Sequence, residues 1–310
     1  MSAVQLNTPV LLLVFKRLET TKQVFSAIRR AQPRRLYIAS DGHRPNVPDE
    51  AEKIANVKRY LVDHVDWDCE IKTLFRDRNL GCRRAISGAI DWFFEQESEG
   101  IILEDDCVPD NSFFLYAEEL LARYRKDTRV MAISGDYLSR HPYASLDSYF
   151  FSRYNLCWGW ATWKRAWRHY DSYEGSWSKL RNTDWLLTVG DGSYHFKSYW
   201  TKIFDELFFE NKPDSWAYRW QYTCWFQNGL IILPTRNLVR NIGFGEEATH
   251  TSNDRSPFSN LPINEQPFPL SHPSGVIRDY RADKWIHENL CEMSLRKRVV
   301  LKLKSALKRK

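Results

Sequence analysis

The sequence predicts an α/β fold with a mostly parallel central sheet that is covered by helices on both faces. From residue 9 to residue 104, short apolar runs alternate with longer stretches of helical periodicity. The apolar runs are nearly continuous, which is typical of strands buried on both faces of a parallel sheet. Turn residues mark where some of these runs end.

The individual elements follow from the same patterns. Residues 9–15 read Pro-Val-Leu-Leu-Leu-Val-Phe, and a helical pattern continues to about Arg30. Ser40-Asp41-Gly42 closes the second apolar run, and Asn79-Leu80-Gly81 predicts a turn. The expected strands are residues 9–15, 36–39, 70–75 and 100–103, and the expected helices are residues 18–30, 49–64 and 85–97. Ligands bind at the carboxyl ends of parallel strands, where Asp41 and Glu104 lie.

The pattern changes at about Phe150. Ten tryptophans lie between residues 158 and 225, and the regular alternation is lost there. Large aromatic side chains bury well, so we expect most of these tryptophans to lie in a core. Residues 251–273 are rich in Ser, Asn and Pro and predict a long surface excursion.

Charge is distributed unevenly along the chain. The formal net charge is +6, and residues 295–310 carry eight lysines and arginines without an acid, which leaves the rest of the chain at −2. This balance excludes a basic nucleic-acid-binding body. Leu295, Val299, Leu303 and Leu307 recur at helical spacing, which predicts a basic amphipathic helix for an anionic membrane surface. A disordered basic end is the alternative.

The remaining composition indicates a soluble protein. No stretch approaches the ~20 consecutive apolar residues of a membrane-spanning helix. Residues 1–9 lack the basic and small-residue features of a signal peptide. The six cysteines form no C-x-x-C pair, so we expect them to be reduced. We therefore expect a cytoplasmic protein, peripheral at the inner face of the membrane through its tail.

Three consecutive carboxylates, Glu104-Asp105-Asp106, follow the apolar run at residues 100–103. Like charges in a partly dry site repel and raise each other's pKa values, and a bound divalent cation removes that cost. Mg²⁺ and Mn²⁺ take carboxylate oxygens and bridge phosphates, so the cluster indicates a metal and phosphate site. The alternative is a solvated acidic turn ahead of a helix that opens at Pro109-Asp110.

The segment around this cluster resembles the metal-binding segment of GT-A-fold glycosyltransferases, in particular the N-acetylglucosaminyltransferase I type and its bacterial relatives. The matching residues are Leu103-Glu104-Asp105-Asp106-Cys107-Val108-Pro109 and Phe113-Phe114. Other matching segments, in order, are Pro9–Arg17, Ser40-Asp41-Gly42, Ile133-Ser134-Gly135-Asp136, Cys157-Trp158-Gly159-Trp160, Phe244-Gly245 and Thr249-His250. The resemblance implies a domain at residues 1–250, with a donor half at about 1–140 and an acceptor half at about 141–250. A loop-rich extension at 251–294 and the tail at 295–310 follow.

The resemblance assigns the donor contacts. Asp106 is the expected metal ligand, Asp105 the ribose contact, and Glu104 a supporting residue or one that faces the acceptor. Arg17 is expected to contact the uracil or a phosphate, and Asp41 the base or ribose. From the residues alone, Arg17 can equally be a surface arginine at a helix start, and Asp41 a turn aspartate before glycine.

Four further residues complete the donor prediction. Arg78 and Arg84 flank a Gly-containing turn and are candidates for binding the diphosphate, with a solvated helix face as the alternative. Thr249 and His250 follow the loop Gly243-Phe244-Gly245, which can close over the donor and exclude water. A structural role is the alternative for His250.

The catalytic base is predicted from a second matching segment. An inverting transfer needs a carboxylate that accepts the proton of the acceptor hydroxyl. In the related enzymes this carboxylate lies beside a tryptophan, in the segment that matches residues 214–220, Asp-Ser-Trp-Ala-Tyr-Arg-Trp. Asp214 is therefore the predicted base, with a helix N-cap as its alternative role, and Asp136 is the reserve candidate. Trp158 and Trp160 are candidates for stacking on the acceptor sugar.

These expectations describe a metal-dependent, inverting glycosyltransferase of the hexosyltransferase type in surface polysaccharide synthesis. Its expected cofactors are Mn²⁺ or Mg²⁺ and a nucleotide-sugar, in particular a UDP-sugar, and its acceptor is a glycan or a lipid-linked glycan. A nucleotidyltransferase is one alternative, although the Gly-rich phosphate loop that it predicts is missing at residues 14–18. A non-catalytic carbohydrate-binding protein is the other, and it has no need for a cation.

Overall fold

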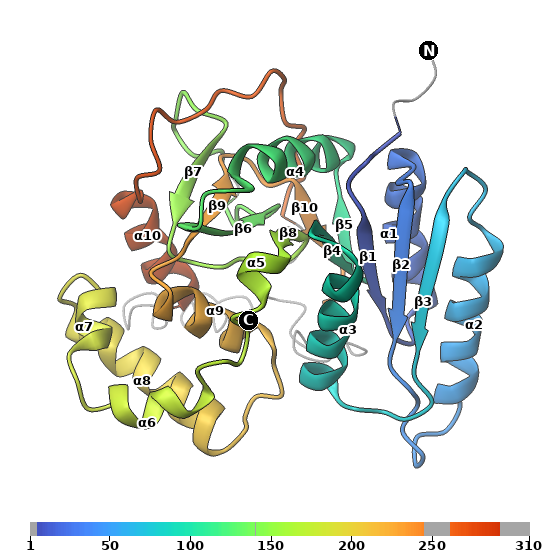
Figure 1. Ribbon diagram of the computed structural model, residues 1–310, viewed down its shortest axis with the longest axis horizontal. Coiled ribbons are helices and arrows are strands. Elements are labelled where there is room, and N and C mark those ends of the chain that lie inside the picture. Colours follow the sequence, from blue (N-terminus) through green and yellow to red (C-terminus); the bar gives the residue numbers. More distant parts are fainter. Residues whose placement is uncertain (1–4, 140, 245–260, 292–310) are drawn as a thin grey trace, which may run out of the picture.

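The computed structural model describes residues 5–139, 141–244 and 261–291 (Figure 1). Its strands are β1 Val10–Val14, β2 Arg35–Ser40, β3 Glu70–Phe75, β4 Glu99–Glu104, β5 Cys107–Pro109, β6 Val130–Ser134, β7 Tyr149–Ser152, β8 Trp160–Trp163, β9 Leu230–Pro234 and β10 Val239–Asn241. Its helices are α1 Leu18–Ala31, α2 Glu50–Asp63, α3 Cys82–Gln96, α4 Asn111–Tyr124, α5 Lys164–Trp167, α6 Trp177–Leu180, α7 Trp185–Val189, α8 Tyr194–Phe209, α9 Ala217–Phe226 and α10 Tyr280–Ile286, with short helical turns at Glu174–Ser176 and His287–Cys291. Within this part of the chain, no helix is long and apolar enough to cross a membrane.

Eight strands form one central sheet in the order β3-β2-β1-β4-β8-β6-β9-β7. β1 to β4 pair in parallel, and β9 pairs in parallel with β6. β8 is antiparallel to both β4 and β6, and β7 is antiparallel to β9. Six of the eight strands therefore point in one direction, which confirms the predicted α/β fold with a mostly parallel sheet.

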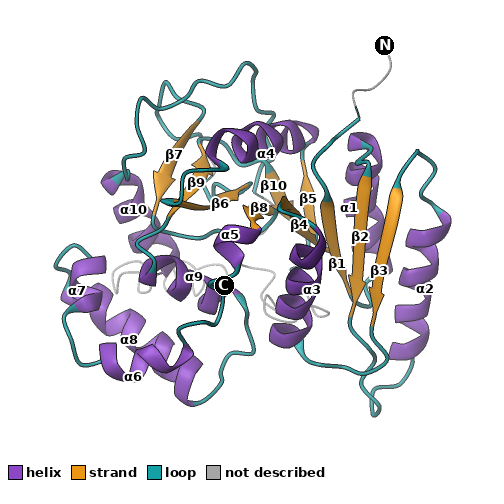
Figure 2. Cartoon of the chain, in the orientation of Figure 1, coloured by secondary structure: helices purple, strands orange, loops and turns teal. Residues whose placement is uncertain are grey.

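Helices cover both faces of the sheet, as Figure 2 shows. Val10, Leu12 and Val14 of β1 face one core with buried residues of α1, α2 and α4. Leu11 and Leu13 face a second core with buried residues of α3, α5, α8 and α9. A strand that alternates between two apolar environments must be apolar at every position, which explains the continuous run in the sequence.

The second half of the chain extends the same sheet. β7, β8 and β9 lie beyond β4, and the region between β8 and β9 contains five helices of 4 to 16 residues. Most of its tryptophans are buried, as expected. The sequence did not predict α10, which lies against β7 in the C-terminal extension. The five cysteines whose side chains the structure describes are free.

A small antiparallel pairing joins β5 to β10, and it places two distant segments side by side. Asn241 pairs with Cys107, and the Ile242 amide donates to the Asp106 carbonyl oxygen at 2.8 Å. The residues that follow β10 therefore lie directly against the acidic cluster that precedes β5.

Candidate functional site

The carboxyl ends of four strands carry predicted site residues. Arg17 follows β1, Asp41 follows β2, Glu104 ends β4, and Asp136 follows β6. Because these strands run in the same direction, their carboxyl ends meet at one edge of the sheet. The structure therefore brings residues from 17 to 136 together at this edge.

Arg17 is ion-paired with both aspartates of the cluster. Its Nη2 atom donates to Oδ1 of Asp105 and lies 2.9 Å from Oδ2 of Asp106. Asp105 also accepts the amide of Phe15 at 3.2 Å. Burial by itself lowers the pKa of Arg17, but the charges of Asp105 and Asp106 outweigh it and raise the pKa above its usual value. The guanidinium therefore stays charged and fixes both carboxylates.

Glu104 lies in a buried, negatively charged environment that disfavours ionisation of its carboxyl. Burial, and then the charges of Asp106 and Asp105, raise the pKa of its carboxyl well above the usual range. The neighbouring Trp216 side chain offsets part of this rise. Trp216 is itself buried and stacks on Trp160 with ring centroids 5.2 Å apart. Part of the tryptophan-rich core thus holds Glu104 in position.

Asp41 organises the turn that leads into α3. Its carboxylate accepts the amide of Leu80 at 3.0 Å and the amide of Gly42 at 3.0 Å. The side chain is 8% exposed, and burial raises its pKa. In the described structure Asp41 therefore serves the backbone at residues 42–81, and its contact with a base or ribose stays a prediction.

Cys82, the first residue of α3, lies among four carboxylates. Burial, and then the charges of Glu104, Asp214, Asp41 and Asp106, raise the pKa of its thiol. Asp214 is exposed, and its Oδ2 atom approaches Gly81, where a Cβ would lie 2.8 Å away. Asp214 therefore lies beside the start of α3, near Gly81 and Cys82.

Asp136 is buried at the end of β6 and does not reach the surface. Its side chain is 1% exposed, and burial raises its pKa well above the usual value. One carboxyl oxygen accepts the amide of Trp158 at 2.9 Å, and the other has no hydrogen-bond partner among the described residues. Because an acceptor hydroxyl has no access to it, this position disfavours Asp136 as the base.

Other predicted residues lie at the margin of the site or outside the described part. Arg78 and Arg84 are exposed. The Arg78 backbone packs so closely against Gly42 that a Cβ at residue 42 would lie 2.5 Å from it. Trp160 is 1% exposed, so it contacts other aromatic side chains and cannot stack on a sugar. Thr249, His250 and the basic tail at residues 295–310 lie outside the described residues.

The structure adds two sets of contacts that the sequence did not predict. Glu50 is 1% exposed and joins the loops after β1 and β2, because it accepts Lys16 Nζ at 3.2 Å and the Arg44 amide at 2.9 Å. Gly243 stands against Asp106, so that a Cβ there would lie 2.0 Å from Oδ2. The Lys16–Glu50 and Asp106–Gly243 contacts join residues more than 30 positions apart in the chain, and no local pattern marks them.

The cluster fits a divalent cation that takes few ligands from the protein. Asp105 and Asp106 share one guanidinium, and their charges raise the pKa of the neighbouring Glu104 carboxyl, so an added positive charge is favourable here. Across the described residues, no group of three or more His, Cys, Asp and Glu is arranged to enclose a metal. Mg²⁺ in phosphate-binding sites is commonly held by one or two carboxylates, with water and phosphate supplying the rest. Asp106 and Glu104 match that donor set.

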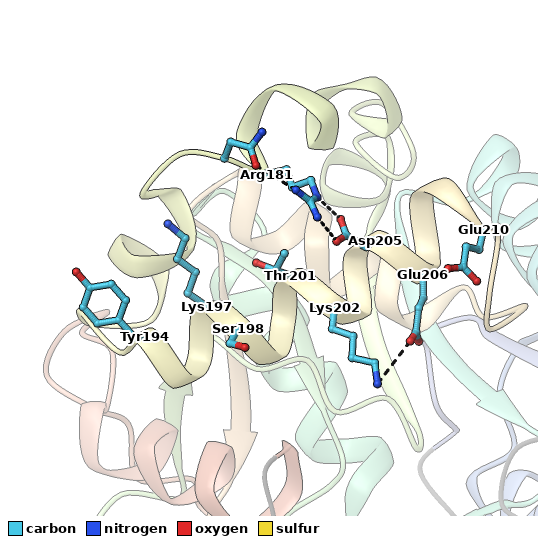
Figure 3. Close-up of a pocket in the computed structure, with 10 residues that line it drawn as sticks. Arg181, Tyr194, Lys197, Ser198, Thr201, Lys202, Asp205, Glu206 and Glu210 are labelled. Carbon is cyan, nitrogen blue, oxygen red and sulfur yellow. Dashed lines mark hydrogen bonds and ion pairs between the residues drawn. The ribbon is translucent and has the colours of Figure 1, made fainter.

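A separate depression of about 570 Å³ lies over the outer face of α8 (Figure 3). Its charged side chains compensate one another. Arg181 pairs with Asp205 at 2.7 and 2.8 Å, and Lys202 lies 3.9 Å from Glu206. None of the site residues predicted from the sequence lines it. Its positive and negative side chains balance, so it has no excess positive charge to bind a phosphate.

Comparison with known proteins yields structural likeness only. No protein-family model and no curated protein matches the chain. A mannosyltransferase from Pyrobaculum calidifontis, solved with GDP-Man and Mn²⁺, has 13% identity and a TM-score of 0.36, over 51% of this chain and 45% of that one. HddC from Yersinia pseudotuberculosis has 10% identity and a TM-score of 0.31, over 51% and 77%. Residues 1–349 of S. aureus TarS have 9% identity and a TM-score of 0.41, over 75% and 59%. The chain thus spans less than two thirds of the mannosyltransferase, and likeness at this level carries no information on its reaction.

Proposed function

We propose that the chain is a GT-A-type glycosyltransferase that moves a sugar from a nucleotide-diphosphate donor to a glycan or glycolipid. The observation that carries this proposal is the convergence of Arg17, Asp41 and residues 104–106 at the carboxyl edge of the sheet. Open α/β sheets bind nucleotides at this edge. A cluster of three carboxylates suits a donor that arrives with a cation and a diphosphate.

The donor diphosphate is expected beside Asp106. A divalent cation, Mn²⁺ or Mg²⁺, held by Asp106 with Glu104 nearby would stabilise the negative charge that develops on the leaving diphosphate. Arg17 keeps Asp105 in a fixed orientation, in which its carboxylate can accept hydrogen bonds from the ribose hydroxyls. Asp41 holds the turn before α3 in place, on the side of the site where the nucleotide is expected.

Asp214 is the residue that we propose as the base of an inverting transfer. Its carboxylate is exposed and lies near Cys82, whose thiol pKa is also raised by the charge of Glu104. There it can accept the proton of an acceptor hydroxyl as that oxygen attacks the sugar carbon. Asp136 is too deeply buried for this step.

The C-terminal tail at residues 295–310 is proposed to hold the protein at an anionic membrane surface. Its support is the sequence pattern of regularly spaced apolar residues among eight basic ones. Vesicle cosedimentation of the full chain and of a chain ending at residue 294 tests this. The shortened chain is expected to lose binding to anionic vesicles, and equal binding by both chains contradicts the proposal.

The enzymatic proposal is tested by titration calorimetry with UDP-sugars and GDP-sugars, with and without Mn²⁺. We expect one nucleotide-sugar to bind the wild-type protein with Mn²⁺ and to bind Asp106→Asn at least about tenfold more weakly. Asp63→Asn is the matched control, because Asp63 is an exposed aspartate at the far end of α2. Binding of no nucleotide-sugar in the presence of Mn²⁺ refutes the proposal.

The same samples separate the alternatives. A nucleotidyltransferase releases pyrophosphate from a nucleoside triphosphate and a sugar phosphate, whereas a glycosyltransferase releases a nucleoside diphosphate. A non-catalytic carbohydrate-binding protein binds glycans with the same affinity with or without Mn²⁺.

A further inference from the structure

The order of the strands divides the site into two sides. Arg17 and Asp41 follow β1 and β2, on one side of β4, and the acidic cluster ends β4 itself. On the other side lie β8 and β6, with Trp158 just before β8 and Asp136 just after β6. A ligand that extends from Asp41 past Asp106 therefore reaches Trp158 next.

The backbone around Trp158 is fixed by contacts between two strand ends. The Trp158 amide donates to the buried carboxyl of Asp136 at 2.9 Å, and the Gly135 amide donates to the Gly159 carbonyl oxygen at 2.8 Å. Gly159 has a φ of +79°, and a Cβ there would lie 2.8 Å from Val239. Only glycine fits this turn, so the backbone next to Trp158 is tightly constrained.

Phe244 meets Trp158 at the acidic cluster. The two ring centroids are 5.8 Å apart with an interplanar angle of 85°, and both side chains are half-buried. Phe244 directly follows Gly243, whose backbone lies against the Asp106 carboxylate. The aromatic pair therefore lies close to Asp106, whose carboxylate Arg17 also contacts.

We propose that Trp158 and Phe244 form a platform for a pyranose ring at the reacting end of the site, and that Asp136 is the positioning residue of this platform. This inference rests on the proposed transferase function and goes beyond it by naming the sugar contact. The C–H face of a pyranose is apolar, and it packs favourably on a flat indole or phenyl ring. The ring can belong to the donor sugar or to the acceptor sugar, since both present the same face.

Contrast with Trp160 supports the assignment. Trp160 is two residues away, but it is 1% exposed and surrounded by Trp167, Trp216 and Trp220. A tryptophan that serves only the core has that environment. Trp158 has an exposed part, a single aromatic neighbour among the described ring contacts, and a buried carboxyl that fixes its backbone.

The test compares ligand binding in Trp158→Ala, Trp158→Phe and a matched control, Trp185→Ala. Trp185 is also half-buried, but it lies in the helical region against Tyr222 and Phe226. The first arm is calorimetry with UDP, UDP-glucose and UDP-N-acetylglucosamine in the presence of Mn²⁺. The second arm is saturation-transfer difference NMR with methyl glycosides of glucose and N-acetylglucosamine, with UDP and Mn²⁺ present.

We expect Trp158→Ala to lose about tenfold in affinity for the sugar in one arm, while its affinity for UDP alone stays within about twofold. Trp158→Phe and Trp185→Ala are expected to stay close to the wild type. A loss in the first arm assigns the platform to the donor sugar, and a loss in the second assigns it to the acceptor. The proposal is overturned if Trp158→Ala has a melting temperature near the wild-type value and binds the sugars in both arms as the wild type does.

Asp136 is tested through the same readouts. Asp136→Asn keeps an oxygen that accepts the Trp158 amide, whereas Asp136→Ala removes it. The platform role predicts that Asp136→Ala weakens sugar binding without affecting UDP and that Asp136→Asn restores it. If UDP binding and sugar binding fall together, Asp136 supports only the fold. One outcome separates the two proposals. If the wild-type protein binds no nucleotide but Trp158→Ala still loses the glycoside signals, the transferase function is refuted and the sugar platform is kept.

Discussion

The Nη2 atom of Arg17 lies 2.9 Å from Oδ2 of Asp106, the carboxylate proposed to hold a divalent cation. The same nitrogen donates to Asp105. The Arg17 guanidinium thus occupies part of the space in which the proposed divalent cation is expected. Arg17 and the cation both stabilise the cluster, and each reduces the need for the other.

Arg17→Gln is therefore expected to make the protein more dependent on metal. Removing one member of a buried ion pair leaves uncompensated charge, which costs about 3 kcal/mol of unfolding free energy without metal. Mn²⁺ is expected to recover part of this loss, so the Mn²⁺-induced rise in melting temperature should be larger in the variant. Urea unfolding and thermal melts with and without Mn²⁺ measure both effects.

Arg29→Gln is the control for this measurement. Arg29 pairs with Asp66 at the protein surface, and both side chains are about half exposed. Its replacement should leave the Mn²⁺ response unchanged. An equal Mn²⁺ response in wild type and Arg17→Gln contradicts the idea that the guanidinium and the cation share the cluster.

Gly243→Ala is expected to disturb the metal site without unfolding the protein. The new Cβ would lie 2.0 Å from Asp106 Oδ2 and 2.8 Å from Arg17 Nη1, so the carboxylate has to move. A displacement of about 1 Å in a reacting site can lower the rate about 100-fold. Transfer kinetics and Mn²⁺ titration check this, with Gly175→Ala as the control because, apart from its chain neighbours, no described residue has an atom within 4 Å of its Cβ position. Wild-type metal affinity in Gly243→Ala would show that this contact is relaxed in solution.

Asp136→Asn is expected to change how stability depends on pH. Burial raises the pKa of Asp136, so the folded protein keeps a proton that the unfolded chain loses above about pH 4. The wild type therefore loses stability from this group as the pH rises through that value. The variant has no such group, so its stability relative to wild type should increase between pH 4 and pH 8. Urea unfolding across this range measures the difference, and a constant difference contradicts the assignment.

Glu50→Gln is expected to show the opposite pH dependence. Hydrogen bonding to Arg44 lowers the pKa of Glu50 from 4.5 to about 2, so its stabilisation is present above pH 4.5 and is lost as the pH falls towards 2. At pH 7 the variant should lose about 2 kcal/mol, because a buried charged hydrogen-bonding group is removed. At pH 2 the two proteins should have similar stability. Unfolding curves at both pH values test this, and equal losses at both would contradict it.

Local patterns in the sequence determined the elements of the first hundred residues. Observed β3 has the predicted bounds, and β1, β2 and β4 differ from prediction by one residue at each end. These elements follow from runs of apolar residues and from helical periodicity, which are local properties. The acidic cluster was also visible locally, because three carboxylates directly follow an apolar run.

Tertiary structure alone decided which residues meet. The Arg17–Asp105 pair spans 88 positions and exists because β4 lies beside β1 in the sheet. Trp158 and Trp160 have the same side chain and lie two positions apart, yet one borders the site and the other lies in the core. The sequence alone made both tryptophans candidates for stacking on the acceptor sugar and could not distinguish them. Apolar patterns specify that a side chain must be buried or half-buried, but which neighbours cover it depends on strand order and helix packing across the whole chain.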